Sequence, residues 1–206
     1  MDCVFCDRSQ FEERLIGETK DFWIIATLGQ ISNSGYTLLV PKQHVECIGA
    51  MNSSEIFPLG EVAKKIGRSI SKEYRTVMTT IFEHGIVGQS IKHAHLHFVP
   101  EVCHLTEKVR SDFPGSAISK INFWSELQSL YQRKPEPYLF WIDSSLEANV
   151  CWNPQNVPMQ YMRTIIAEAV GRPERANWRT MDPELDKKLW SETVRRLKPY
   201  FPQLPH

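Results

Sequence analysis

Three histidines alternate with apolar residues in the segment 92–100, KHAHLHFVP. They are His93, His95 and His97, and the residue after each of them is apolar. Alternate residues of an extended strand share one face, so the pattern predicts a strand over 93–99 with three imidazoles on one side and an apolar row on the other. Three titratable rings in one row, next to the glycine-containing turn 88–90, indicate a functional site.

The chain around this row is predicted to form an α+β domain. Runs rich in β-branched and aromatic residues predict strands at 21–27, 36–40 and 77–82. Apolar residues at helical spacing predict a helix over 54–74, with Asn52 and Glu55 as its capping box. We expect a meandering antiparallel sheet, because short loops join neighbouring antiparallel strands, and one helix that covers the sheet.

The composition changes after Pro100, and the second half is predicted to be a mainly helical extension. Helices are expected at 106–113, 118–132, 160–170 and 183–200, and paired strands at 138–143 and 148–152. Gly171 suits the end of the third helix, and Asp182 followed by Pro183 suits the start of the fourth. We therefore expect a domain at 1–104 and an extension at 105–206 packed on it, with Trp178 and Trp190 in the contact.

The bulk composition excludes several classes of partner. Lys and Arg total 24 and Asp and Glu total 24, so the net charge gives no sign of a nucleic-acid or membrane surface. No apolar run approaches the length of a membrane span, and the N-terminus lacks the pattern of a signal peptide. The chain has five cysteines, an odd number without the spacing of a disulfide framework, so we expect a cytoplasmic protein.

The histidine row supports two chemical interpretations, since its strict period makes three incidental histidines a poor explanation. One is a zinc site, because neutral imidazole is a common zinc ligand. In a strand, the Cα atoms of His93 and His97 would lie about 13 Å apart, so at most two of the three rings could bind one ion. The other makes His95 a nucleophile that attacks phosphorus. The turn favours the second, because Gly88, Gln89 and Ser90 can present N–H, amide and hydroxyl groups to an anion.

The stretch GQSIKHAHLHFVP resembles the signature of the histidine triad (HIT) superfamily of nucleotide hydrolases and transferases, over about residues 3–100. The resemblance implies an α+β fold, commonly dimeric, that acts on the α-phosphate of a nucleotide ester, amide or dinucleoside polyphosphate. It makes His95 the nucleophile, with His93 in the same catalytic row, and His97 a contact to the phosphate and leaving group. Gln89 and Ser90, beside Gly88, would hold the phosphate oxygens. A third histidine instead of Gln favours hydrolysis over transfer.

Cys3 and Cys6 form a CxxC pair that supplies two of the four ligands of a structural zinc ion. His44 and His93 are the candidates for the other two, and many superfamily members that this chain resembles bind zinc through these positions. Two buried thiols are an alternative, and a redox pair is disfavoured because no thioredoxin-like pattern follows. The other three cysteines are interpreted as packing residues: Cys47, Cys103 and Cys151.

Some positions depart from the superfamily pattern. Leu28, beside Thr27, stands where Asn or Asp usually binds the ribose, and Leu cannot accept a hydrogen bond. Glu83 stands near the expected phosphate, or is a solvated acid at a strand end. Gly35-Tyr36 replaces the usual Gly-His.

The segment 157–179 resembles the CwfJ-like branch, which is linked to RNA processing. Its arginines are interpreted as exposed helix residues rather than an RNA path: Arg163, Arg172, Arg175 and Arg179.

The sequence therefore predicts a cytoplasmic HIT-type nucleotide hydrolase that forms a covalent nucleotidyl-His95. A structural Zn²⁺ and a homodimer are expected, and no catalytic metal is required. One alternative is a nucleotide- or RNA-binding module without turnover, and another is a zinc hydrolase that uses His95 and His97 as ligands. A nucleotide is favoured over RNA as the partner, and no membrane is expected.

Overall fold

The computed structural model describes residues 3–202. The strands are β1 (Leu15–Glu18), β2 (Phe22–Ala26), β3 (Thr37–Pro41), β4 (Thr80–Gly85), β5 (Leu96–Val99), β6 (Ala117–Ile121), β7 (Tyr138–Ile142) and β8 (Ala148–Trp152). The helices are α1 (Ser53–Tyr74), α2 (Thr106–Asp112), α3 (Trp124–Arg133), α4 (Tyr161–Ala169) and α5 (Pro183–Leu197). Short 3₁₀ turns lie at Arg8–Gln10, Glu12–Arg14, Ile48–Ala50, Pro173–Arg175 and Lys198–Tyr200.

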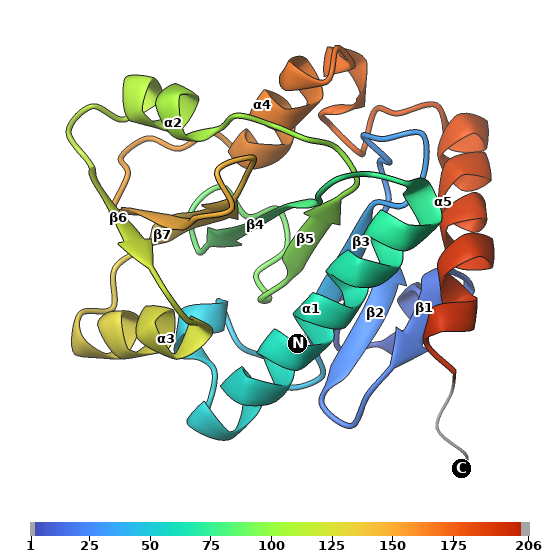
Figure 1. The fold of residues 1–206 in the computed structure, drawn as a ribbon, viewed down its shortest axis with the longest axis horizontal. Helices are drawn as coiled ribbons and strands as arrows, with labels where there is room; N and C mark the ends of the chain where they lie inside the picture. Colours follow the sequence, from blue (N-terminus) through green and yellow to red (C-terminus); the bar gives the residue numbers. More distant parts are fainter. Residues whose placement is uncertain (1–2, 203–206) are drawn as a thin grey trace.

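All eight strands form one antiparallel sheet in the order β1-β2-β3-β5-β4-β7-β8-β6 (Figure 1). The predicted α+β class and meandering sheet are confirmed. The junction between the two halves lies inside this sheet, where β4 pairs with β7 over five residue pairs from Ile81↔Ile142 to Gly85↔Tyr138. The strands predicted at 138–143 and 148–152 are confirmed as β7 and β8, which pair with each other and, through β7, join the sheet of the N-terminal half.

Helices cover both faces of the sheet, and each face has its own apolar core. Helices α1 and α3 lie on one face, where Leu96 and Phe98 pack with Ile66 and Leu127 (Figure 1). Helices α2 and α4 lie on the other, with a second set of buried residues that includes Phe82. Helix α5 lies along the β1–β2 edge. Because side chains alternate along each strand, residues of β5 divide between the two cores.

The helix boundaries follow the capping signals in the sequence. The Glu55 carboxylate accepts the N–H of Asn52 at the start of α1 (3.2 Å), and the Asp182 carboxylate accepts the N–H of Leu185 at the start of α5 (2.7 Å). Gly171 follows α4 with a φ of +70°, the left-handed conformation that favours glycine. The predicted capping residues of these helices are confirmed.

The helix predicted over 118–132 is wrong in its first part. Residues Ala117–Ile121 form β6, which pairs with β8, and the helix α3 begins only at Trp124. The apolar residues of this stretch fit a helical period, but the N–H and C=O groups of β6 complete the edge of the sheet. A tertiary strand pairing has overridden the local preference.

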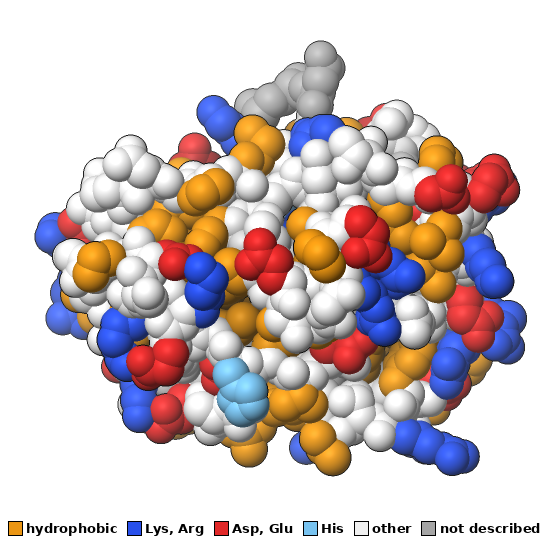
Figure 2. Space-filling model, turned by 90° about the horizontal axis from the view of Figure 1, so that it is seen from above, with side chains coloured by type: hydrophobic (Ala, Val, Ile, Leu, Met, Phe, Trp, Pro, Cys, Tyr) orange, Lys and Arg blue, Asp and Glu red, His pale blue; other side chains and the backbone are white. Residues whose placement is uncertain are grey.

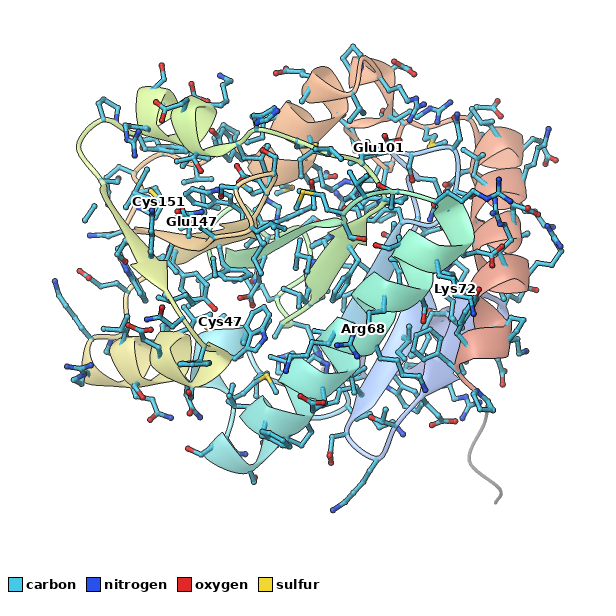
Figure 3. The ribbon with its side chains drawn as sticks, viewed as in Figure 1. Cys47, Arg68, Lys72, Glu101, Glu147 and Cys151 are labelled. Atoms are coloured by element: carbon cyan, nitrogen blue, oxygen red, sulfur yellow. The ribbon has the colours of Figure 1, made fainter. Side chains whose placement is uncertain are left out.

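The surface and the buried thiols agree with the composition. Figure 2 shows Lys and Arg interspersed with Asp and Glu on the face that it draws. No helix within residues 3–202 combines the length and apolar character needed to cross a bilayer. Cys47 packs in one core and Cys151 in the other, far apart in the interior, and Cys103 is also buried, so the prediction of packing thiols is confirmed (Figure 3).

Candidate functional site

The three histidines lie on the sheet face opposite α1, at the start of β5. Ala94, Leu96 and Phe98 all lie in the core beneath α1, so the predicted alternation of faces is confirmed. The strand itself is shorter than the predicted 93–99, because the N–H of Ala94 donates to the carbonyl of Val45 in the loop after β3 (2.7 Å) instead of joining a sheet ladder. His93 and His95 therefore belong to the segment that leads into β5.

His95 presents one ring nitrogen to a cavity and has the other fixed. Its Nδ1–H donates to the carbonyl oxygen of His93 (2.5 Å), so the lone pair is on Nε2. The ring is 6% exposed and packs against Phe5 at 5.3 Å between centroids. Burial, together with the nearby His93 and Arg163 side chains, lowers the pKa of His95 to about 4, although the hydrogen bond to the His93 carbonyl acts in the opposite direction. The ring is neutral at pH 7.

His97 lies beside His95, with 4.7 Å between ring centroids, and its own ring stacks on Phe82 at 4.1 Å. Its Nδ1 is 2.7 Å from the hydroxyl of Tyr36, and its Nε2 is buried without a hydrogen-bond partner. Burial, followed by the charges of His95, His84 and Arg163, holds the pKa of His97 well below its usual range. His97 is therefore also neutral, with one nitrogen left for a ligand.

The cavity beside these rings has a volume of about 720 Å³. Its wall includes predicted residues from both halves of the chain: Thr27, Leu28, Ser90, His95, His97, Trp178 and Arg179. The wall also holds four basic side chains (Arg14, Lys92, Arg163 and Arg179) against one acidic side chain, Glu46. The charge of the wall favours an anionic ligand.

Gly88 and Gln89 are absent from the cavity wall and instead hold the turn in place. The side-chain amide of Gln89 donates to the carbonyl of Glu46 (2.7 Å), and the carbonyl of Gly88 accepts the N–H of Gln160 (2.7 Å). Gly88 has a φ of +71°, and an added Cβ would lie 2.9 Å from the carbonyl oxygen of Pro158. Within the predicted phosphate turn, only Ser90 reaches the cavity, and its hydroxyl accepts the indole N–H of Trp178 (3.4 Å).

Glu83 lies outside the cavity, and the alternative of a solvated acid is also wrong. Its side chain is fully buried on the α3 face of the sheet, where its carboxylate accepts the N–H of Ile48 (2.8 Å) and the hydroxyl of Tyr138 (2.6 Å). Burial raises its pKa to about 7, although both hydrogen bonds lower it. Glu83 joins β4 to β7 and to the turn at Ile48.

The arginines of the segment 157–179 were predicted to be exposed helix residues, and this is wrong for three of them. Arg172 and Arg175 lie after α4, and their side chains are only 25% and 14% exposed. Arg163 departs furthest from the prediction. It was expected to be exposed on a helix, yet it is 3% exposed and forms part of the cavity wall. Tyr36, noted in the sequence only as a departure, meets it there: the Arg163 guanidinium donates to the Tyr36 hydroxyl (3.1 Å). A sequence signal existed in α4, where Arg163 stands among residues that are apolar nearly all round the helix.

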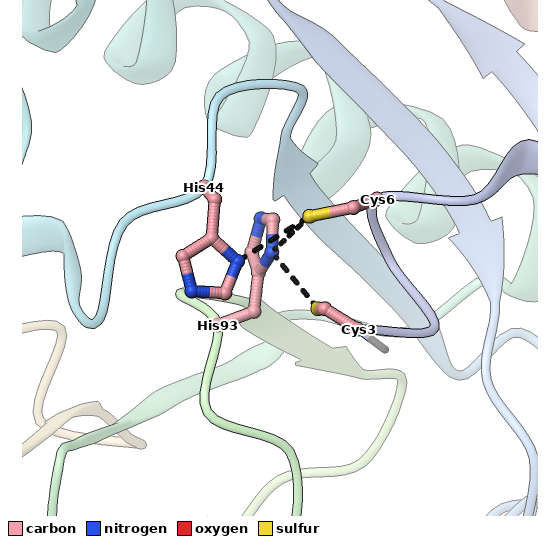
Figure 4. Close-up of side chains that lie close together, drawn as sticks. All are labelled: Cys3, Cys6, His44 and His93. Atoms are coloured by element: carbon pink, nitrogen blue, oxygen red, sulfur yellow. Dashed lines mark hydrogen bonds between the residues drawn. The ribbon is translucent and has the colours of Figure 1, made fainter. Parts of the chain in front are cut away.

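Four candidate metal ligands lie close together beside the segment that leads into β5: Cys3, Cys6, His44 and His93 (Figure 4). Their ligand atoms lie within 4.8 Å of one another, with sulfur–nitrogen distances of 3.3, 3.4 and 3.6 Å. A tetrahedral zinc site with usual bond lengths has sulfur–nitrogen edges of about 3.5 Å. The Nε2–H of His93 donates to the carbonyl of Pro41 (2.9 Å), which leaves Nδ1 for a metal. The donor set and spacing fit zinc.

The fold and the site together define an α+β domain in which alternating histidines border an anion-attracting cavity. Residues 8–104 match the HIT domain family, so this part of the chain is similar to the histidine triad proteins. A curated protein of Bacillus subtilis named Protein hit is 25% identical over 103 residues, which cover 48% of this chain and 70% of that protein.

Two solved structures are similar to part of the chain. A HIT-like protein from Bartonella henselae is 20% identical with a TM-score of 0.40, and the match covers 43% of this chain and 65%, just under two thirds, of that one. A zinc-bound histidine triad family protein from Mycobacterium smegmatis is 24% identical with a TM-score of 0.44, and the match covers 49% and 76%. Each of these three matches covers less than half of this chain.

Proposed function

We propose that this protein is a hydrolase that acts at the α-phosphate of a nucleotide ester, phosphoramidate or dinucleoside polyphosphate through a covalent nucleotidyl-His95. The observation that carries the proposal is the fixed orientation of His95. Its Nδ1–H is held by the carbonyl of His93, so the Nε2 lone pair belongs to a ring on the cavity wall. A nucleophilic imidazole needs this arrangement.

The reaction has two steps. The Nε2 lone pair of His95 attacks the α-phosphorus, a P–N bond forms, and the bond from phosphorus to the leaving group breaks. The leaving group departs with the electron pair and takes up a proton. Water then attacks the same phosphorus, the P–N bond breaks, and the water releases a proton, which yields the nucleoside monophosphate and free His95.

The charges of the cavity support an anionic substrate. Arg163 is a buried cation in the wall, and Lys92, Arg14 and Arg179 add positive charge to the same wall. Such fixed charges stabilise negative charge that develops on phosphate oxygens in a site with little water. Ser90 adds a hydroxyl at the same wall.

A structural Zn²⁺ is part of the proposal and would be held by Cys3, Cys6, His44 and His93. When bound, it would tie the N-terminal CxxC to the segment that carries His95, two residues after His93. None of the four proposed ligands is the nucleophile, so the reaction as proposed requires no catalytic metal. The alternative of a zinc hydrolase that uses His95 and His97 as ligands predicts loss of zinc in His95→Ala, whereas the proposal predicts that zinc is lost with Cys3 and Cys6 and kept in His95→Ala.

The homodimer and the nucleotide partner remain predictions, as do the CwfJ-like relationship and the cytoplasmic location. Within residues 3–202, only β1 and β6 have an unpaired sheet edge. A second copy that extends the sheet would have to join at one of these strands.

The test is the mass of the intact protein after brief exposure to a fluorogenic adenosine phosphoramidate and, separately, to a dinucleoside polyphosphate. We expect one nucleotidyl group on His95, no adduct and no turnover in His95→Ala, and retained binding in His95→Asn. His104→Ala, an exposed histidine outside the cavity, is the matched control and should react normally. Binding of labelled nucleotide without turnover, unchanged by His95→Ala, would instead support a binding module.

A further inference from the structure

Arg163 reaches the histidine site from α4, in the half of the chain outside the matched HIT domain. Its guanidinium donates to the hydroxyl of Tyr36 (3.1 Å) and to the carbonyls of Gly29 (2.7 Å), Ala176 (3.1 Å) and Arg175 (3.3 Å). No ion pair between residues 3 and 202 involves it, although it is almost fully buried. An arginine buried without a carboxylate is costly, so its position needs a reason.

The contact with Tyr36 fixes the direction of a short chain of hydrogen bonds. Guanidinium is only a donor, so the Tyr36 oxygen accepts from Arg163. The Tyr36 O–H then points to its other partner, Nδ1 of His97 at 2.7 Å. If His97 carried its proton on Nδ1, two donors would meet at the Tyr36 oxygen, and the buried hydroxyl proton would have no acceptor among these groups. Nδ1 of His97 is therefore an acceptor, and its proton is on Nε2.

The Nε2–H of His97 is a donor without a protein partner. Nε2 is buried and makes no hydrogen bond, while the ring forms part of the cavity wall. An oxygen of a bound ligand would satisfy it. The neighbouring ring has the opposite tautomer, because His95 donates from Nδ1 and has its lone pair on Nε2. One ring thus offers a lone pair and the next offers an N–H.

We propose that Arg163 is a positioning residue that acts through Tyr36 to hold His97 in the Nε2–H tautomer, so that His97 donates to an anionic oxygen of the substrate. The catalytic part of this inference rests on the proposed function, whereas the tautomer does not. The C-terminal half would then complete the site of the HIT domain, because Arg163 lies outside the matched residues 8–104 and supplies the hydrogen bond to Tyr36. His97 keeps its proton throughout and contributes a hydrogen bond to the oxygen.

The test is a long-range ¹H–¹⁵N NMR experiment on protein labelled with ¹⁵N-histidine, which reports the tautomer of each ring without any substrate. We expect His97 to be entirely Nε2–H in the unaltered protein and a mixture of tautomers in Tyr36→Phe and in Arg163→Met. Arg163→Lys keeps a cationic donor and should restore the Nε2–H form in part. Arg172→Met is the matched control, because Arg172 bonds to Ile31 and Glu101 away from the histidines, and it should leave His97 unchanged.

Two results would overturn the inference: an Nδ1–H form of His97 in the unaltered protein, or an unchanged His97 in Tyr36→Phe. Tyr36→Phe decides the question if Arg163 variants fail to fold, because it removes a single oxygen atom. Where nucleotide turnover is found, Tyr36→Phe should lower kcat about tenfold with little change in KM, since the lost hydrogen bond acts on the transition state. Absence of turnover would count against the proposed function and leave the NMR result standing.

Discussion

The metal-ligand cluster and the cavity wall use neighbouring members of one histidine row, yet they differ in what holds each ring. In the cluster, His93 donates from Nε2 to a backbone carbonyl and turns Nδ1 toward two thiols. In the wall, His95 donates from Nδ1 to a carbonyl and leaves Nε2 without a protein partner, and His97 has its Nδ1 2.7 Å from the Tyr36 hydroxyl. The difference teaches that the partner of one ring nitrogen decides what the other nitrogen can do.

The two regions also differ in the origin of their residues. All four candidate metal ligands lie in the first 93 residues, two of them in the N-terminal CxxC. The cavity, by contrast, is completed by Arg163, Trp178 and Arg179 from the second half. Damage to the cluster should therefore affect structure first, whereas damage to the wall should affect chemistry and leave the metal in place.

The largest expected effect is on turnover, and it comes from a change at His95 in the cavity wall that should leave the metal-ligand cluster intact. His95→Ala should lower turnover at least about 10⁴-fold, because loss of a nucleophile removes the covalent route, while the zinc content stays unchanged. Turnover and metal content are measured on the same preparation. Loss of zinc together with activity would show that the two regions cannot be separated and that His95 has a structural role.

The second prediction removes ligands from the metal-ligand cluster and leaves the cavity wall unchanged. The double variant Cys3→Ser, Cys6→Ser should lower the zinc content from about one ion per chain to near zero. It should also lower the free energy of unfolding by about 4 kcal/mol when free zinc is about a thousand times its Kd, because the ion binds the folded state. Elemental analysis and urea unfolding check both numbers, with Cys151→Ala as the control for a buried thiol outside the cluster. Full zinc content in the double variant would contradict the assigned ligands.

The sequence could predict the parts of the site that local spacing encodes. CxxC, the His44 that follows Pro-Lys-Gln, and the alternating histidines each lie within a few residues, so their chemistry is visible without a fold. Four ligands from three segments were predicted as one cluster, and they do meet. The capping residues of α1 and α5 are local in the same sense, and they were also predicted correctly.

The remainder depends on contacts between distant segments. Tyr36 and Arg163 are 127 positions apart, and nothing in either neighbourhood indicates that they meet. Glu83 reads as a strand-end acid until β7 pairs with β4 and brings the Tyr138 hydroxyl to it. For the same reason β6 was predicted as helix, because only pairing with β8 makes it a strand.

Glu83 extends the comparison to a buried titratable group on the opposite face of the sheet. Its folded-state pKa of about 7 lies above the ordinary value of 4.5, so its stabilising contribution is complete below about pH 4.5 and is lost as the pH rises through 7. This change amounts to about 3 kcal/mol. Urea unfolding at pH 5 and pH 8 should show that this loss is absent from Glu83→Gln and present in the control Glu13→Gln, an exposed acid. An equal pH dependence in Glu83→Gln would mean that the buried carboxyl does not titrate in this range.

The smallest effect concerns Leu28, which lines the cavity at the sequence position where the superfamily pattern expects a ribose-binding residue. Leu28 is part of the wall but offers no hydrogen bond, whereas Leu28→Asn adds one for a ribose hydroxyl. One neutral hydrogen bond is worth about 1 kcal/mol, so KM for a ribonucleotide substrate should fall about fivefold at unchanged kcat. KM for the 2′,3′-dideoxy analogue should not fall. Leu28→Met, which keeps an apolar side chain of similar volume, is the control. A fall in KM for both substrates would place the ribose away from residue 28, and the cavity would then bind the nucleoside in a different orientation from the one that the superfamily pattern implies.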